Sequence, residues 1–153
     1  MAVFAVEKFA AAYPEASELL KLHWDEVAPY KDLFTLNPDL ERYQRLEDQG
    51  SLCVITAREE GTLIGYIVMV VAPNLHYKQA LCATDDIHFV HPDYRKGSLG
   101  SRLIVTAVAL MKKAGVKVMF LRTKVANSHG LLFERLGFEP LDMVYSMRLD
   151  KDD

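Results

Sequence analysis

Residues 91–104 read His91-Pro-Asp-Tyr-Arg-Lys-Gly-Ser-Leu-Gly-Ser-Arg-Leu-Ile104. They follow a strand-like run, residues 86–90, and lead into an apolar-periodic run, residues 103–111, that predicts a helix. A tight turn before a helix directs backbone N–H groups toward one point, where the helix dipole favours an anion. Arg95 and Lys96 add positive charge, and Gly97 and Gly100 allow close approach to the backbone. The pattern predicts a pyrophosphate-binding loop; the simpler alternative is an ordinary strand–helix turn with surface charges.

The composition indicates one globular domain, 1–153, because half of its residues are apolar and a quarter are charged. A formal net charge of -3 and a pI near 5.9 argue against nucleic-acid partners and an anionic membrane surface. Cys53 and Cys82 are too few for a disulfide scaffold or a CxxC zinc site, so we expect reduced thiols and no metal. No signal-peptide pattern opens the chain, and its longest apolar run, residues 64–72, is far below the ~20 residues of a membrane span. We therefore expect a cytoplasmic protein.

The hydrophobic period changes from helical to strand-like along the chain. Gly115 should cap the helix that follows the basic turn. The strands before and after that helix should be parallel, and the other connections suit an antiparallel sheet, which predicts an α+β domain. Helices are expected over residues 6–13 and 16–27 with a break at Pro14, 38–48 with Asn37 as its cap, 101–113 and 128–136. Strands are expected over residues 52–58 and 63–71 (a hairpin turning at 59–61, its second strand central), 81–90, 116–122, 138–141 and 143–149.

This order of elements, together with the basic turn, resembles the GNAT superfamily of N-acetyltransferases. The family's acyl-CoA loop runs Gln/Arg-x-x-Gly-x-Gly/Ala in a Val-x-Pro-x-Tyr-Arg frame, and here the frame reads Val90-His-Pro-Asp-Tyr-Arg-Lys-Gly-Ser-Leu-Gly100. Ser98 occupies the first-glycine position, with Gly97 one residue earlier. Residues 131–138, Leu-Leu-Phe-Glu-Arg-Leu-Gly-Phe, look like the helix and Gly-Phe ending that follow the family's fourth strand. The chain most resembles the small stand-alone members found in bacteria and their phages.

The resemblance implies a mixed, mostly antiparallel central sheet with one splayed parallel strand pair, flanked by about four helices. It also implies direct transfer of an acetyl group from acetyl-CoA to an amine on a small molecule or a protein. Acetyl-CoA would lie in the splay, with its pyrophosphate on the loop and the Arg95 side chain as an added phosphate contact. Asn127 could instead cap a helix, and Phe133 could be core. The expected cofactor-binding residues are Phe89, Val90, Arg95, Lys96, Gly97, Ser98, Leu99, Gly100, Ser101, Asn127 and Phe133.

Amine acetylation needs a proton acceptor for the amine and a proton donor for the departing thiolate. In much of the family a carboxylate on the third strand takes the first role, and Asp86 lies near that position. Strand alternation would place Asp86, His88 and Val90 on one face and Asp85 on the other. Asp86 or His88 is therefore the candidate base, unless they are a solvated carboxylate and a core histidine. The tyrosine that many members use as the acid falls on Phe133, so Tyr145 or a water becomes the candidate acid, unless no acid acts at all.

The acceptor side would come from the N-terminal helices and from the loop before the third strand. The candidate substrate-binding residues are His23, Trp24, His76 and Tyr77, although Trp24 on an apolar stripe also suits the core. Ser98 and Phe133 depart from the family pattern and keep a second function open, a weak or inactive GNAT-fold protein that binds CoA, a macromolecular partner, or both. A homodimer through exposed strands is a further possibility that the resemblance implies.

Overall fold

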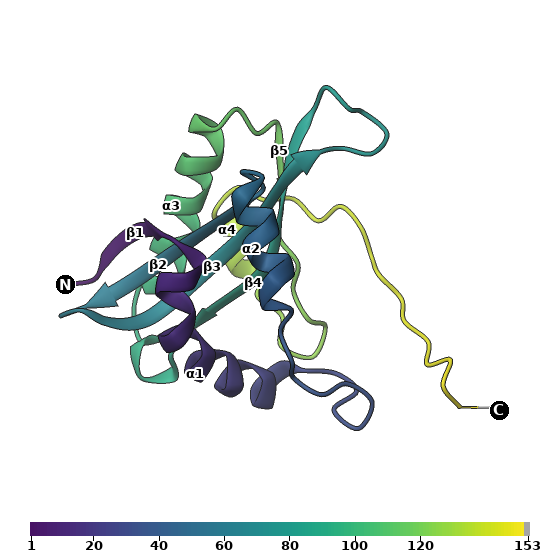
Figure 1. Cartoon of the computed structure of the whole chain (residues 1–153), viewed down its shortest axis with the longest axis horizontal. Helices are drawn as coiled ribbons and strands as arrows, with labels where there is room; N and C mark the ends of the chain where they lie inside the picture. The colour runs from purple at the N-terminus through teal and green to yellow at the C-terminus, as the bar shows by residue number, and fades with distance from the viewer. Residues whose placement is uncertain (152–153) are drawn as a thin grey trace.

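The computed structural model describes residues 1–151, in which a five-stranded sheet carries helices on both faces (Figure 1). Within these residues, no helix is both long and apolar enough to cross a membrane. A short 3-10 turn, Pro92–Tyr94, follows the fourth strand. The strands are β1 Val3–Glu7, β2 Leu52–Glu59, β3 Thr62–Pro73, β4 Leu81–Val90 and β5 Val118–Phe120. The helices are α1 Phe9–Val27, α2 Leu40–Asp48, α3 Leu99–Lys113 and α4 Gly130–Arg135.

The sheet has the order β1-β2-β3-β4-β5, and every neighbouring pair is antiparallel except β4 and β5. This arrangement confirms the predicted mixed, mostly antiparallel sheet with one parallel pair. β3 is the central strand, and its residues 63–69 are buried, as their continuous apolar run predicts. The β2–β3 hairpin turns at Glu60 and Gly61, which both have positive φ, 48° and 82°. A two-residue turn of this kind matches the twist of the strands.

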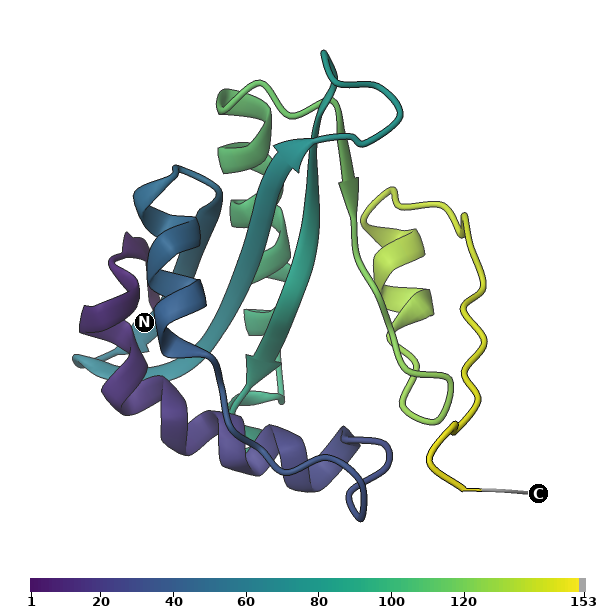
Figure 2. The same cartoon turned by 45° about the vertical axis from the view of Figure 1, so that its right-hand side comes forward.

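The N-terminal third differs from the sequence prediction in three places. Residues 3–7 form an edge strand, although residues 6–13 were expected to be helical. Pro14 does not divide the first helix: α1 runs from Phe9 to Val27 with Pro14 inside it, and Figure 2 shows a bend in this helix. The cap of α2 is Asp39, whose carboxylate accepts the Arg42 N–H at 3.0 Å, in place of Asn37.

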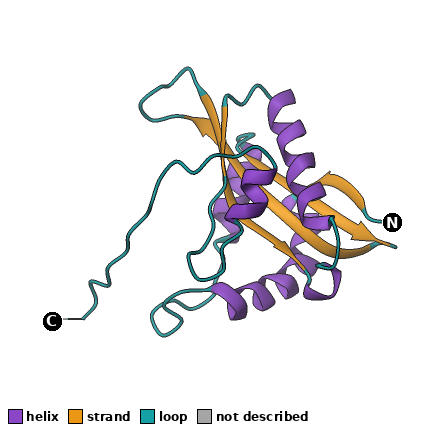
Figure 3. Cartoon of the chain, turned by 180° about the vertical axis from the view of Figure 1, so that it is seen from behind, coloured by secondary structure: helices purple, strands orange, loops and turns teal. Residues whose placement is uncertain are grey.

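The C-terminal prediction of two strands is wrong. β5 covers only Val118–Phe120 of the seven residues expected, 116–122. Residues 138–141 and 143–149 form no strand; Figure 3 shows them as irregular chain after α4, and Ser146 and Arg148 contact Tyr30 and Asp32 in the loop after α1. The apolar residues of this segment are exposed, and strand periodicity alone cannot supply the neighbouring edge that a strand needs. β5 is therefore the last strand of the sheet in the single chain.

Two apolar layers fix the helices to the sheet. On one face, Leu103, Ala107 and Met111 of α3 pack on Ile67 and Met69 of β3. The opposite face carries α1, where the buried core comprises Ala12, Leu19, Val54, Leu63, Tyr66, Val68 and Phe89. The sheet thus separates two sides, and Figure 2 shows α1 and α2 on one side and α3 on the other. The side chains of β4 point to both sides of the sheet.

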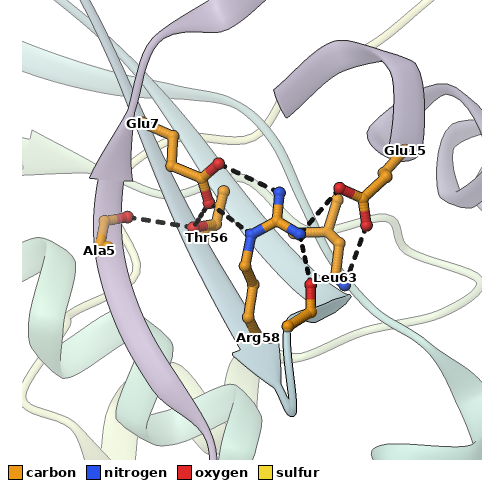
Figure 4. A network of polar contacts seen from close by, with 7 residues as sticks. Ala5, Glu7, Glu15, Thr56, Arg58 and Leu63 are labelled. Atoms are coloured by element: carbon orange, nitrogen blue, oxygen red, sulfur yellow. Dashed lines mark hydrogen bonds and ion pairs between the residues drawn. The ribbon is translucent and has the colours of Figure 1, made fainter. Parts of the chain in front are cut away.

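Arg58 joins the N-terminal strand and helix to the hairpin (Figure 4). Its guanidinium donates to the Glu7 carboxylate from Nε at 2.8 Å and from Nη2 at 3.1 Å, and to Glu15 from Nη1 at 2.8 Å. Glu7 also accepts from the Thr56 hydroxyl, and Glu15 accepts the Leu63 N–H. The hydrogen bonds from Arg58 hold the pKa of Glu7 below its ordinary value. This network joins β1 and α1 to the β2–β3 hairpin.

We expect Arg58→Met to lower the free energy of unfolding by about 2 kcal/mol at pH 7, because Glu7 loses its charged donors in a mostly buried position. The wild-type contribution is present above pH 4.5, the ordinary pKa of Glu7, and is lost as the pH falls through the lower folded pKa. The difference between the two proteins should therefore shrink below pH 4.5 in urea titrations. Arg42→Met, at an exposed position of α2, is the control. A difference that stays constant down to pH 2 would contradict this role.

Candidate active site

β4 and β5 are paired over only three residues each and then separate. The pairs are Cys82 with Val118, Ala83 with Met119 and Thr84 with Phe120. Figure 2 shows the two strands diverging beyond this point. At the start of the splay the Asp85 side chain, only 4% exposed, accepts the Arg122 backbone N–H at 3.1 Å and its Nε at 3.3 Å. The Asp85 carboxylate thus takes the place of the next backbone hydrogen bond between β4 and β5. The contact between Asp85 and Arg122 therefore holds the predicted opening between the strands.

A bulge in β4 reverses the predicted faces of its acidic residues. Val68 pairs with Ile87 and Met69 pairs with Asp85, so Asp86 is the extra residue. An extra residue shifts the alternation that follows it by one position. Asp85 and His88 consequently share the side of α4, whereas Asp86 faces α2. The expectation that Asp86 and His88 share a face, with Asp85 opposite, is therefore wrong.

His88 lies in an aromatic group on the α4 side of the splay. Its Nδ1 is 3.4 Å from the second carboxylate oxygen of Asp85. Its ring lies 5.7 Å from both His129 and Phe133, centroid to centroid. Because Nδ1 is engaged by Asp85, Nε2 is the nitrogen left for another partner. Burial lowers the pKa of His129, and His88 adds to that effect.

Asp86 lies on the opposite side, where its carboxylate accepts a hydrogen bond from the Tyr43 hydroxyl of α2. Both residues line a cavity of about 60 Å³ between α1, α2 and the sheet. Tyr66 also lines this cavity and is only 4% exposed, and its hydroxyl has no hydrogen-bond partner among residues 1–151. Burial raises the pKa of Tyr66, and the charge of Asp86 raises it further. The two groups are thus close enough to interact, although they are not bonded to each other.

The loop after β4 ends at the N-terminus of α3. Ser98 precedes the helix, and its side chain makes no capping hydrogen bond. The first helical bond runs from the Arg102 N–H to the Ser98 carbonyl, so the amides of residues 99–101 come before the intrahelical pattern. The Leu99 side chain is buried in the core, which leaves only its backbone for a ligand. Lys96, Gly97 and Ser98 are exposed, while Gly100 and Ser101 are half-buried. The geometry is that of an anion site built mainly from backbone groups.

The Arg95 side chain folds back toward β4 and α1. Its two terminal nitrogens donate to the Glu26 carboxylate at 2.8 Å each, and its Nε donates to the Val90 carbonyl at 2.9 Å. The guanidinium also lies 5.1 Å from the centre of the Phe89 ring, which stacks on His23 at 4.9 Å. Burial lowers the pKa of His23 to about 4, so this ring is neutral at pH 7. In this structure Arg95 therefore joins α1 to the loop, and its side chain is engaged away from the helix N-terminus.

Five other predicted residues lie outside this group. Tyr145 is 84% exposed in the C-terminal segment. His76 and Tyr77 are exposed in the β3–β4 loop, which lies at the opposite end of β4 from residues 95–101, here called the anion loop. Trp24 is half-buried on α1 beneath the Lys31 ammonium, which is 5.3 Å from the ring centroid. Asn127 is exposed and does not cap α4, whose N-cap is His129. Among residues 1–151, no group of acidic, histidine and cysteine side chains could hold a metal ion.

Several residues of the site were not predicted. Tyr43 and Glu26 reach β4 from helices far away in sequence, and Tyr66 reaches the cavity from the neighbouring strand β3; all three resemble ordinary helix or strand residues. The prediction placed Asp85 on the wrong face of β4 because no residue in the sequence indicates the bulge. His129 had a detectable signal, since it lies four residues before Phe133 at the start of a helix. That spacing places both side chains on one face.

Comparison with known proteins addresses the fold. The chain resembles ribosomal-protein-alanine N-acetyltransferase from Brucella melitensis biovar Abortus 2308, with a TM-score of 0.72, 17% identity and coverage of 97% of this chain and 99% of that one. Glucosamine-6-phosphate N-acetyltransferase from Arabidopsis thaliana gives a TM-score of 0.75 at 14% identity, covering 98% and 99% of the two chains. An aminoglycoside acetyltransferase, meta-AAC0020, from an uncultured soil metagenomic sample gives 0.71 at 17%, covering 96% and 97%. At these identities the likeness establishes the fold.

The sequence comparison addresses the family. No curated protein matches the chain significantly. The family model described as "Acetyltransferase (GNAT) family" matches residues 16–138, which include the splayed strands, the anion loop and α4. The matched residues cover most of the chain, and its structural neighbours include N-acetyltransferases. The chain therefore belongs to the GNAT family of acetyltransferases.

Proposed function

We propose that this protein transfers an acetyl group from acetyl-CoA to a primary amine by direct transfer, with the acceptor approaching from the side of Asp86. The carrying observation is the splay itself, where an unpaired stretch of β4 leads into an α3 N-terminus that has no side-chain cap. A strand edge can pair with an amide-containing arm, and a helix N-terminus can hold a diphosphate. A carboxylate, Asp86, lies at the point where the strands separate.

The residues on the loop fit a diphosphate. The amides of residues 99–101 supply donors, the α3 dipole favours negative charge, and Lys96 adds a mobile cation. β4 from Asp85 to Val90 offers backbone groups on its splayed side. Phe133 is buried beside His88 and forms an apolar wall of the opening. When bound, acetyl-CoA supplies the acetyl group in activated form, as a thioester.

The two faces of β4 divide the proton transfers. Asp86 faces the acceptor cavity and accepts the proton that the attacking amine gives up, directly or through a water. His88 faces Phe133, on the other side of the strand. With Nδ1–H donating to Asp85, the imidazolium form of His88 gives its Nε2 proton to the departing CoA thiolate, while Asp86 holds the proton that the amine released. The pair Asp85–His88 thereby replaces the tyrosine that many family members carry at the position of Phe133.

Release of free thiol from acetyl-CoA, measured with a panel of primary amines, tests this proposal. Calorimetric titration with acetyl-CoA is run in parallel. Binding together with amine-dependent thiol release supports the enzyme. Binding without release for any amine would instead favour a CoA-binding protein with another partner. Phe133 is the reason to consider this outcome, because phenylalanine cannot donate a proton at the position where many family members carry a tyrosine. Absence of acetyl-CoA binding would refute both functions.

The C-terminal segment supports a homodimer as part of this proposal. Every second residue is apolar, namely Leu141, Met143, Tyr145, Met147 and Leu149, and each is 71–84% exposed. Bonds from Ser146 to Tyr30 and from Arg148 to Asp32 hold the segment beside the loop after α1. A segment with one apolar face and no strand partner suits addition to a sheet edge. The outer edge of β5 in a second copy of the chain supplies such an edge.

Deletion of residues 141–153 should convert a dimer to a monomer. The reason is that the deletion removes all five alternating apolar side chains and the backbone that would pair with β5. Light scattering after size-exclusion chromatography, over a range of protein concentrations, measures the change in mass. The paired substitution Met143→Lys and Met147→Lys should act in the same direction without shortening the chain. A full-length protein that is monomeric at every concentration would refute the dimer.

A further inference from the structure

We infer that the cavity between α1, α2 and the sheet is the acceptor site, and that it takes a primary amine carried on a short apolar chain of about two to four carbons. This inference rests on the proposed acetyl transfer and specifies its acceptor. Its walls are aromatic and aliphatic, and Asp86 is the one charged residue of the described lining. Asp86 is itself exposed, so the carboxylate marks the open end of the cavity.

Two hydroxyl groups of the cavity are engaged within the protein. The Thr56 hydroxyl donates to the Glu7 carboxylate, and the Tyr43 hydroxyl donates to Asp86. The Tyr66 hydroxyl is buried and has no partner in the described structure, and the hydroxyl of half-buried Tyr13 also makes no hydrogen bond there. A buried hydroxyl without a partner is costly, so a ligand that brings a polar group beside it gains binding free energy. An amine between Asp86 and Tyr66 would meet both requirements, because one oxygen is anionic and the other can accept an N–H.

The size of the cavity limits the rest of the ligand. Its volume, about 60 Å³, is less than half of the ~150 Å³ of an apolar cavity that holds benzene. A phenyl ring therefore exceeds the space available, whereas a short alkyl chain fits. Phe9 closes one side: it stacks on Tyr43 at 5.0 Å, and its N–H is fixed by the Glu47 carboxylate at 2.7 Å. The absence of any cationic side chain from the described lining also disfavours an acceptor that carries phosphate.

The first experiment measures thiol release with a series of linear alkylamines from methylamine to hexylamine. Each methylene that enters the cavity should raise kcat/KM by about fourfold. We expect the rise to stop near butylamine, when the cavity is full. The N-terminal amine of a peptide offers the same chemistry, so peptides that begin with valine and with glycine are compared with the alkylamines. A preference for valine would assign the site to peptide termini, and a preference for free alkylamines would assign it to small molecules. Flat kcat/KM across the series, or faster reaction of glucosamine 6-phosphate or tobramycin, would overturn the inference.

Two substitutions test the cavity directly. Ala16→Leu adds three carbons to a half-buried position of α1 that lines the cavity, whereas Ala11→Leu adds them at an exposed position of the same helix. Ala16→Leu should lower kcat/KM for butylamine about tenfold or more and leave methylamine unchanged, and Ala11→Leu should change neither. Equal values for the two variants with butylamine would refute the site.

Tyr66→Phe separates ligand binding from stability. Removing an unpaired buried hydroxyl should leave the melting temperature unchanged or raised, while kcat/KM for propylamine falls about tenfold and the Kd of acetyl-CoA stays constant. Calorimetry of butylamine against butanol, without acetyl-CoA, measures occupancy of the cavity even if no transfer occurs. Acetyl-CoA binding with transfer to other amines only would refute this inference and leave the proposed function intact. No acetyl-CoA binding would refute the proposed function. Calorimetry with butylamine would then be the one remaining test of whether the cavity binds an amine.

Discussion

Gly100→Glu should abolish acetyl-CoA binding and leave the protein folded. Gly100 is the second residue of α3, within the group of amides proposed to hold the diphosphate. A carboxylate there would lie beside the phosphate oxygens, and like charges placed together at an interface cost several kcal/mol. We expect the Kd of acetyl-CoA to rise by at least about 100-fold in calorimetric titrations.

The local structure explains why folding should survive this change. A Cβ atom at position 100 meets only the Val90 Cγ2 at 4.0 Å, an ordinary contact. Glutamate also has a higher helix propensity than glycine by about 0.5 to 1 kcal/mol, and an anion in the first turn favours the helix dipole. The melting temperature should therefore be equal to that of the wild type or higher.

Gly100→Ala is the matched control, because it makes the same backbone change without the charge. It should keep the Kd of acetyl-CoA within about tenfold of the wild type. If Gly100→Glu bound acetyl-CoA as the wild type does, the diphosphate would lie elsewhere and the proposed function would lose its main support. If both variants lost binding equally, steric exclusion would be the cause, and charge repulsion at this position would be refuted.

The parts of this protein that the sequence predicts well are those whose signals are local. The basic turn, the boundaries of β4 over residues 81–90 and the hairpin at Gly61 depend on neighbouring residues, and the structure agrees with each. The central position of β3 follows from a continuous apolar run, which only a strand covered on both faces can bury. The family motifs lie in the same region of the chain, so fold and family were predictable together.

The wrong predictions concern residues whose position depends on contacts with residues distant in sequence. Asp85 and Asp86 are adjacent and chemically alike, and a single bulge against β3 assigns one to His88 and the other to Tyr43. Position 145 alternates as a strand would, yet its segment forms no ladder with β5, and sequence periodicity does not report which edge a segment pairs with. Arg95 carries the charge expected of a phosphate ligand, but Glu26, 69 residues away, engages its guanidinium. In each case the residue type indicated a possible role, but the sequence did not show which residue it contacts.

Asp86→Asn should lower kcat/KM by about 10² to 10⁴, the usual contribution of a positioned general base, and leave the Kd of acetyl-CoA unchanged. Asparagine retains an oxygen that can accept the Tyr43 hydroxyl, so the contact between α2 and β4 can persist. The side chain loses the ability to take a proton from the amine. The experiment uses the amine with the fastest thiol release and compares turnover with acetyl-CoA affinity in the same preparation.

The control for this substitution is Asp48→Asn, which removes an equal charge from an exposed position at the end of α2. It should not change turnover, and a loss equal to that of Asp86→Asn would show that net charge, not the bulged carboxylate, controls the rate. His88→Gln separates the remaining alternative, because His88 faces the other side of β4. If Asp86→Asn retained full activity and His88→Gln lost it, the amine proton would pass to the Asp85–His88 pair, and the acceptor would have to approach from the α4 side. Loss of activity in both variants is the result that the proposed division of proton transfers predicts, because the bulge directs Asp86 and His88 to opposite faces of one strand.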